Sequence, residues 1–235
     1  MSSIDIIFFD AGETLIHPHP SFPELFAQVC AENDIEVDPD RVADVQGRLA
    51  PHLVDIAEDT GVTAPSLDPD DSRTFWTYLY RRLLEELDIE GPGLTEVLYA
   101  RFSDSASYKI FDDVLPALSA LEAAGYRLGL ISNFEGWLEN ILVEQQLGET
   151  FEVSVISGLE GVEKPDPHIY RLAVERAGVD PSRSVHVGDS PVMDVRPARE
   201  VGINAILLDR TGRYMNSGYS TIASLEELPE VVTKL

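Results

Sequence analysis

The sequence of 235 residues contains one cysteine, few lysines and no long apolar run. The single thiol, Cys30, excludes an intramolecular disulfide and any cysteine-rich zinc site. No apolar stretch approaches the roughly 20 residues that a membrane-spanning helix needs. The N-terminus enters an apolar β-type run directly, without the basic and apolar regions of a signal peptide. These absences predict a cytoplasmic protein without a membrane partner.

Basic residues are scarce, with 17 Lys and Arg against 42 Asp and Glu and a formal net charge of −25. The lysines are Lys109, Lys164 and Lys234 only. Nucleic acid and anionic membranes both need a cationic footprint, so this charge argues against either as a partner. An acidic surface is compatible with a high-salt cytoplasm, because salt screens self-repulsion while the charge keeps the protein soluble.

Strand-like and helix-like segments alternate along most of the chain. Five short apolar, β-rich runs are Ile4–Phe9, Tyr126–Ser132, Phe151–Ser157, Ser184–Gly188 and Asn204–Asp209. From the second run onward, helical periodicity fills the gaps at Leu138–Leu147, Pro167–Ala177 and Val192–Val201. Near-continuous apolar strands alternating with helices predict an α/β fold with a doubly wound parallel sheet covered on both faces.

The first and second strand-like runs are separated by more than 100 residues that are mostly helical in pattern. The helical stretches are Phe22–Asn33, Asp40–Ala57, Ser72–Leu87, Leu94–Phe102 and Val114–Ala124. A break rich in Pro, Asp and Ser at 64–71 divides them. We therefore predict a Rossmann-like core from residues 1–16 and 112–235, with a helical domain inserted at 17–111.

Polar side chains follow several predicted strands at the point where each strand ends. In open α/β sheets, ligands bind outside these carboxyl ends, near the point where strand order reverses. The residues are Asp10 and Thr14, Ser132 and Asn133, Lys164, Asp189 and Ser190, with Asp194 further on. Carboxylates, hydroxyls and an ammonium at one sheet edge suit the joint binding of a divalent cation and a phosphoryl group.

Four segments, "IDIIFFDAGETL", "SN", "GVEKPDP" and "GDS", occur in order at these strand ends. Together they resemble the motifs of the haloacid dehalogenase-like (HAD) hydrolase superfamily. The long helical insert resembles the branch with an α-helical cap after the first motif. The chain departs from the usual pattern at Gly12, where that superfamily commonly has a second aspartate.

The resemblance implies a role for each matching residue. Asp10 would attack phosphorus and form an aspartyl-phosphate that water hydrolyses. Asp10, Asp189 and the backbone carbonyl of Gly12 would hold Mg²⁺. The remaining implied roles are phosphoryl binding by Ser132 and the Asn133 amide, charge neutralisation by Lys164, and orientation of Lys164 or a metal-bound water by Asp194, with Thr14 and Ser190 as neighbouring site residues.

Gly12 removes the side chain that normally donates a proton to the leaving group and later activates water. Loss of a general acid–base typically costs about 10²- to 10⁴-fold in rate. A substrate with a good leaving group, such as an aryl or acyl phosphate, depends on it least. Glu13, His17 and His19 are conceivable replacement donors, although the two histidines are also typical of a stiff, solvated linker.

Three functions are compatible with these residues. The first is a Mg²⁺-dependent hydrolase of small phosphorylated molecules, slowed by Gly12. The second is a 2-haloacid dehalogenase using Asp10 on carbon without a metal, for which the retained Asp189 and Asp194 have little use. The third is a regulatory protein that keeps the fold without turnover. The sequence leaves the substrate open, as well as the choice between monomer and homodimer.

Overall fold

The computed structural model describes residues 4–214 and 218–235. The chain forms two compact units, Met1–Ile16 together with Ile110–Leu235, and His17–Lys109. We call the first the sheet unit and the second the helical unit. The assignment of the two units as catalytic core and cap stays a prediction.

The sheet unit contains six parallel strands in the order β5-β4-β1-β6-β7-β8. Their bounds are β1 Ile6–Phe9, β4 Arg127–Ser132, β5 Val153–Ile156, β6 Ser184–Gly188, β7 Asn204–Leu208 and β8 Thr221–Ile222. The first five correspond to the five predicted runs, and the short β8 was not predicted. The doubly wound parallel α/β fold is therefore confirmed.

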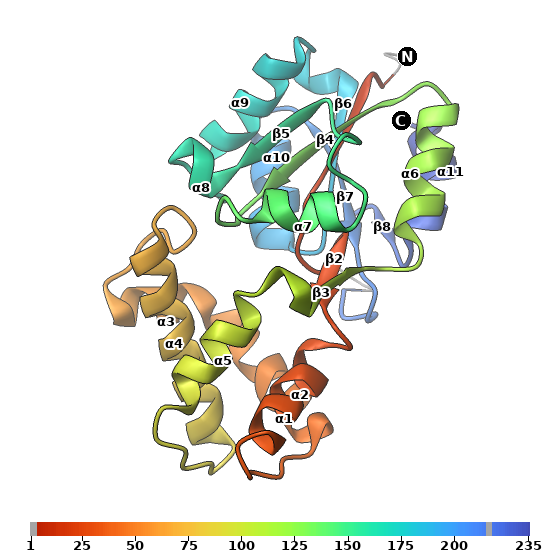
Figure 1. Ribbon diagram of the computed structural model, residues 1–235. Helices are drawn as coiled ribbons and strands as arrows, with labels where there is room; N and C mark the ends of the chain where they lie inside the picture. The colour runs from red at the N-terminus through yellow and green to blue at the C-terminus, as the bar shows by residue number, and fades with distance from the viewer. Residues whose placement is uncertain (1–3, 215–217) are drawn as a thin grey trace. The chain divides into compact units, whose positions relative to one another are not determined.

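Helices lie against both faces of this sheet, which explains why its strands are apolar on both sides. Helices α9 (Pro167–Ala177) and α10 (Arg196–Glu200) cover one face, and α6 (Val114–Ala123) and α11 (Leu228–Val232) lie on the other (Figure 1). All four residues of β1 are buried. The central strand is thus a rigid support for the residue that follows it, Asp10.

The remaining segments of the sheet unit are short. They are α7 Leu138–Glu144, α8 Ser157–Glu160, the 3₁₀ turns Pro181–Arg183 and Leu225–Glu227, and a π-helical turn at Pro191–Val195. The predicted helix Val192–Val201 is therefore two segments, because the chain begins with the π-helical turn before α10. Ser190 caps this turn, its Oγ accepting from the Met193 amide at 3.2 Å.

The helical unit consists of α1 Phe22–Ala31, α2 Pro39–Leu49, a 3₁₀ turn at Ala50–His52, α3 Leu53–Thr60, α4 Pro69–Glu86, α5 Leu94–Phe102 and a 3₁₀ turn at Ser105–Ser107. The predicted helix Asp40–Ala57 is broken at the Ala50–His52 turn, since a proline at position 51 supplies no backbone N–H. A core that includes Phe26, Cys30 and Tyr80 holds the helices together. Burial raises the pKa of the Cys30 thiol to about 11.

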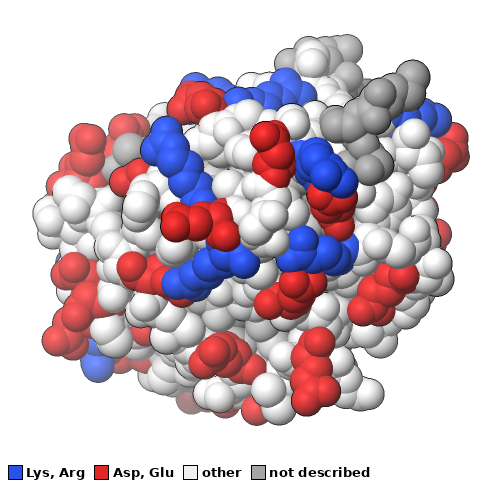
Figure 2. Space-filling view, turned by 90° about the horizontal axis from the view of Figure 1, so that it is seen from above, with Lys and Arg blue, Asp and Glu red and all other residues white. Residues whose placement is uncertain are grey.

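Where the chain passes between the units, β2 (Ile16–Pro18) and β3 (Tyr108–Ile110) pair in a two-stranded sheet. Within the described ranges, no helix is both long and apolar enough to cross a membrane. Figure 2 shows basic side chains interspersed with acidic ones on the face that it presents.

Candidate functional site

The candidate residues gather where the order of the parallel strands reverses. Strand β1 lies between β4 and β6, and the chain continues outward from β4 on one side and from β6 on the other. Asp10 follows β1 directly, Ser132 is the last residue of β4, and Asp189 follows β6. This is the position at which doubly wound sheets bind ligands.

Lys164 connects two buried carboxylates of the site. Its Nζ donates to Oδ1 of Asp10 at 2.6 Å and to Oδ1 of Asp194 at 2.7 Å. Only 3% of the Lys164 side chain is exposed, so these charges are largely shielded from water. Burial alone would lower the pKa of Lys164, but the two carboxylates outweigh it and raise the pKa above its ordinary value. Lys164 therefore remains a cation throughout the physiological pH range.

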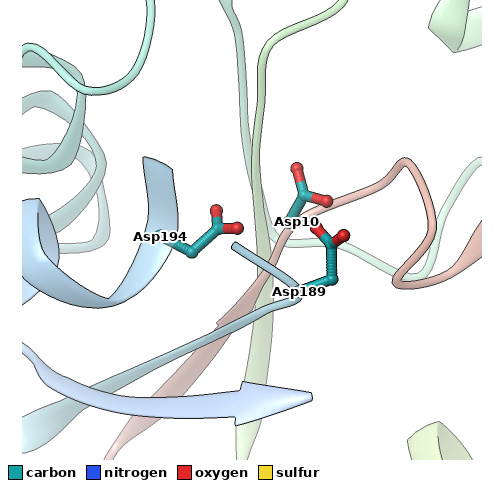
Figure 3. A group of neighbouring side chains, drawn as sticks. All are labelled: Asp10, Asp189 and Asp194. Atoms are coloured by element: carbon teal, nitrogen blue, oxygen red, sulfur yellow. The ribbon is translucent and has the colours of Figure 1, made fainter. Parts of the chain in front are cut away.

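Three carboxylates lie close together at this edge of the sheet (Figure 3). Asp10, Asp189 and Asp194 each present an oxygen, and these oxygens lie within 4.8 Å of one another. Burial and the negative charge of Asp194 raise the pKa of Asp10, while Lys164 opposes this shift. Burial, together with Asp194 and Asp10, also raises the pKa of Asp189. Clustered carboxylate oxygens with an excess of negative charge fit a hard divalent cation.

Asp194 differs from Asp10, which accepts from Lys164 through Oδ1, because both oxygens of Asp194 accept hydrogen bonds. Oδ1 accepts from Lys164 and from Nε2 of His186 at 3.0 Å, and Oδ2 accepts from the Ser190 amide at 3.0 Å. Burial would raise the pKa of Asp194, but Lys164 and His186 more than compensate and lower it. Its contacts fit an anchor for Lys164 better than a ligand of the metal.

Gly188, at the end of β6, makes room for this anchor. A Cβ atom at position 188 would lie 2.2 Å from Cγ of Asp194 and 2.5 Å from its Oδ2. Both distances are far inside van der Waals contact, so any side chain there would displace the carboxylate. The glycine of the "GDS" segment is therefore required by the position of Asp194.

Ser132, the last residue of β4, lies close to Asp10, and the next residue, Asn133, contacts Lys164. Ser132 Oγ is buried, and its distance to Oδ1 of Asp10 is 3.4 Å, which is long for a hydroxyl hydrogen bond. The Asn133 side chain exchanges two hydrogen bonds with the backbone of Lys164, one at 2.6 Å from the lysine amide and one at 2.8 Å to its carbonyl. Asn133 thus positions the lysine loop, a role that the sequence did not indicate.

The turn after Asp10 contains Gly12, Glu13 and Thr14. Gly12 has no atom within 4 Å of where a Cβ would stand and no left-handed φ, so a side chain fits there. Glu13 adopts φ of +56°; burial of its carboxyl and the nearby Asp10 raise its pKa, whereas Arg210 lowers it. Thr14 is fully buried, and its Oγ1 finds no hydrogen-bond partner among the described residues.

Two residues near the site were not singled out from the sequence. His186 stands on β6 with its ring buried and contacts Asp194. Arg210 comes shortly after β7 and binds the turn that follows Asp10 through the Thr14 carbonyl, at 2.9 Å. In the sequence, a histidine inside an apolar strand and an arginine just after a strand end were the features that could have identified these two residues.

His17 and His19 belong to the helical unit, where His17 Nδ1 lies 2.8 Å from the Pro18 carbonyl. Asp10 belongs to the sheet unit, so the part of these two histidines in proton transfer stays a prediction.

Comparisons with known proteins identify a family and relatives that cover most of the chain. The family described as haloacid dehalogenase-like hydrolase matches residues 4–202. A relative from Danio rerio, haloacid dehalogenase-like hydrolase domain-containing protein 3, is 30% identical over 236 aligned residues, covering 95% of this chain and 94% of that protein. A glyceraldehyde 3-phosphate phosphatase from Pyrococcus furiosus is 27% identical and covers 100% of this chain and 94% of its own length.

Solved structures share the fold over almost the whole chain. A magnesium-bound putative HAD-hydrolase from Bacillus subtilis has a TM-score of 0.76 at 18% identity, covering 98% of this chain and 99% of that one. An L-2-haloacid dehalogenase from Xanthobacter autotrophicus has a TM-score of 0.66 at 18% identity, with 99% of each chain covered. The family match and the full-length relative together show that this chain belongs to the haloacid dehalogenase-like hydrolases.

Proposed function

We propose that the protein is a Mg²⁺-dependent phosphatase of small phosphorylated molecules, with Asp10 as the nucleophile. The observation that carries the proposal is the excess of carboxylate at the site. Asp10, Asp189 and Asp194 meet a single ammonium, that of Lys164, and a divalent cation offsets the remaining negative charge. In this proposal the sheet unit is the catalytic core and the helical unit is the cap of the family.

Asp10 begins the reaction with a carboxylate oxygen that attacks phosphorus. The bond between phosphorus and the leaving oxygen breaks, the leaving group takes the electron pair, and Asp10 carries the phosphoryl group as an acyl phosphate. Water then attacks this phosphorus, releases phosphate and restores the carboxylate. Lys164 offsets negative charge on Asp10 and on the phosphoryl oxygens, since its Nζ already lies 2.6 Å from Asp10.

Asp10, Asp189 and the Gly12 carbonyl are the groups that would hold Mg²⁺, because Asp194 is occupied by its own donors. When bound, the ion supplies positive charge to the phosphoryl oxygens. Ser132, the last residue of β4, and the backbone amide of Asn133 would donate hydrogen bonds to those oxygens.

Gly12 leaves the protonation of the leaving oxygen without its usual donor. The chain therefore acts best on phosphates whose leaving groups are weak bases, such as aryl and acyl phosphates, for which a general acid contributes least. The phosphatase name of the relative from Pyrococcus furiosus supports phosphoryl chemistry over the dehalogenase alternative. The dehalogenase structure supports only the shared fold.

The test is phosphate release from p-nitrophenyl phosphate, with Mg²⁺ or with EDTA, by the parent protein and by Asp10→Asn. Asp209→Asn is a matched control, because Asp209 is also a buried aspartate directly after a strand, but its carboxylate accepts hydrogen bonds from the amides of Arg213 and Tyr214 and makes no ion pair among the described residues. We expect turnover that requires Mg²⁺, disappears in Asp10→Asn and persists in Asp209→Asn.

Two results would contradict the proposal. Turnover that survives Asp10→Asn would remove Asp10 as the nucleophile. Absence of turnover in the parent protein, also at high KCl, would favour the alternatives, and chloride release from 2-haloacids would then distinguish the dehalogenase from a regulatory protein without catalysis.

A further inference from the structure

Arg210 forms an ion pair with Asp113 inside the sheet unit. Its Nη1 lies 2.8 Å from Oδ2 and its Nη2 lies 2.9 Å from Oδ1 of that carboxylate. Both side chains are largely buried, with exposed fractions of 19% and 11%. A guanidinium and a carboxylate joined by two parallel hydrogen bonds are fixed in direction as well as in distance.

The same guanidinium also contacts both segments that connect the sheet unit with the helical unit. Nη2 donates to the carbonyl of Thr14, on the outgoing segment, at 2.9 Å. The guanidinium carbon lies 3.9 Å from the ring centroid of Phe111, on the returning segment. The two segments are also bonded to each other, since the Phe111 amide donates to the Leu15 carbonyl at 3.1 Å.

Asp113 is held in place from a second direction, by the chain near the C-terminus. Its Oδ2 accepts from Ser224 Oγ at 2.8 Å and from the Leu225 amide at 2.9 Å. The carboxylate is therefore held in a fixed position. Arg210, bound to it, is held in turn and restrains the Thr14 carbonyl through its hydrogen bond.

The segment that receives this contact begins one residue after Asp10. It is a tight turn in which the Ala11 carbonyl accepts from the amides of Leu15 and Ile16 at 2.8 and 2.9 Å. Catalysis by positioning is sensitive to small displacements, since a shift of about 1 Å costs about 10²-fold in rate. Holding this turn therefore bears directly on the attack geometry of Asp10.

We infer that Arg210 is a positioning residue, which fixes the turn after Asp10 by binding the Thr14 carbonyl while Asp113 anchors it. The kinetic part of this inference rests on the proposed phosphatase function. Arginine is needed because it makes two hydrogen bonds to Asp113, one to Thr14 and a stacking contact with Phe111 at the same time. A lysine ammonium cannot reproduce that planar arrangement.

The test compares Arg210→Lys with a matched control, Arg127→Lys. Arg127, at the start of β4, makes the same kind of contacts: two hydrogen bonds to Glu152, at 2.7 and 2.6 Å, and one to the Ala177 carbonyl, at 2.8 Å. These lie at the end of the strand remote from Ser132. Both variants keep the positive charge, but only Arg210→Lys alters the contact with the Thr14 carbonyl in the turn after Asp10.

We expect Arg210→Lys to lower kcat for p-nitrophenyl phosphate by about 10- to 100-fold, with a smaller change in KM. Arg127→Lys should stay within about threefold of the parent. Hydrogen–deuterium exchange of the amides of Leu15, Ile16 and Phe111 should accelerate in Arg210→Lys and stay unchanged in Arg127→Lys. Asp113→Asn, with Arg210 in place, should also lower kcat and accelerate exchange of these amides. It replaces Arg210→Lys in the test if that variant does not fold.

Unchanged exchange at these amides in Arg210→Lys or Asp113→Asn would overturn the inference. Equal losses of kcat in Arg210→Lys and Arg127→Lys would also overturn it, because the effect would then be general destabilisation. If the parent protein lacks turnover, the proposed function fails by itself, and the exchange comparison alone decides whether Arg210 holds the turn.

Discussion

The ammonium of Lys164 lies 2.6 Å from Oδ1 of Asp10, although the two residues are 154 positions apart in the chain. The pair is buried, and a second carboxylate, that of Asp194, lies 2.7 Å from the same nitrogen. The proposed nucleophile Asp10, the Lys164 cation and Asp194 are thus connected by two charge-assisted hydrogen bonds. A change to any one of them is therefore expected to affect both turnover and stability.

Lys164→Met should abolish most turnover and lower the melting temperature. The variant keeps the approximate volume of the side chain but leaves two buried carboxylates without their cation, a loss of about 3–5 kcal/mol in the free energy of unfolding. Lys109→Met, on the exposed part of β3, is the control and should change neither quantity. Turnover of Lys164→Met within tenfold of the parent would remove the lysine from the mechanism.

Gly12→Asp should increase phosphatase activity, by up to about 10²- to 10⁴-fold for substrates with poor leaving groups. The new side chain meets open space and an ordinary backbone conformation, so the melting temperature should change little. Gly12→Ala adds a side chain without an acid and is the control, which should leave the rate unchanged. No gain in Gly12→Asp would indicate that another group already supplies the proton.

Gly188→Ala should reduce both activity and stability. Its methyl group would stand 2.2 Å from Cγ of Asp194, which forces the anchor away from Lys164. Overpacking of this kind costs about 1–3 kcal/mol. Gly47→Ala, in helix α2, has no atom within 4 Å of the new methyl group and is the control. The melting temperature and the turnover rate should therefore both be lower in Gly188→Ala than in Gly47→Ala.

The Asp113 carboxylate should make stability depend on pH on the acid side. Burial raises its pKa, but hydrogen bonds from Arg210, Leu225 and Ser224 outweigh burial and lower it. Because the unfolded chain then binds a proton first, this stabilisation is present above the unfolded pKa of about 3.9 and is lost as the pH falls through the folded pKa.

Asp113→Asn should therefore flatten the decrease in the free energy of unfolding between about pH 5 and pH 3, measured by urea denaturation. Asp112→Asn removes a neighbouring exposed carboxylate and controls for the change in net charge. Identical slopes in Asp113→Asn and the parent would show that the Arg210 pair contributes nothing to acid stability.

The net charge of −25 should make the protein more stable in concentrated salt. Self-repulsion among acidic side chains destabilises the folded state, and added KCl screens it, because the screening length falls from about 10 Å at 0.1 M to about 3 Å at 1 M. The melting temperature should rise with KCl between these concentrations. A constant or falling melting temperature would contradict the high-salt hypothesis.

The sequence by itself determined five of the six strands of the sheet and several of the polar residues that follow them. Five apolar runs became β1, β4, β5, β6 and β7, because continuous burial on both faces leaves a clear pattern. Parallel strands end at a common edge, so the sequence alone predicted that Asp10, Ser132 and Asp189 lie near one another. The shorter helices were less predictable, since a π-helical turn and a proline break interrupt patterns that look continuous.

Only the tertiary structure decided how those residues contact one another. The donors around Asp194, the two hydrogen bonds between Asn133 and the Lys164 backbone, and the link from Asp113 through Arg210 to Thr14 all join residues far apart along the chain or depend on the direction of a side chain. Periodicity reports which face of an element is buried. It carries no information on which polar atoms come into contact once the elements pack. In this protein those contacts distinguish Asp10, the candidate nucleophile, from Asp194, which anchors Lys164.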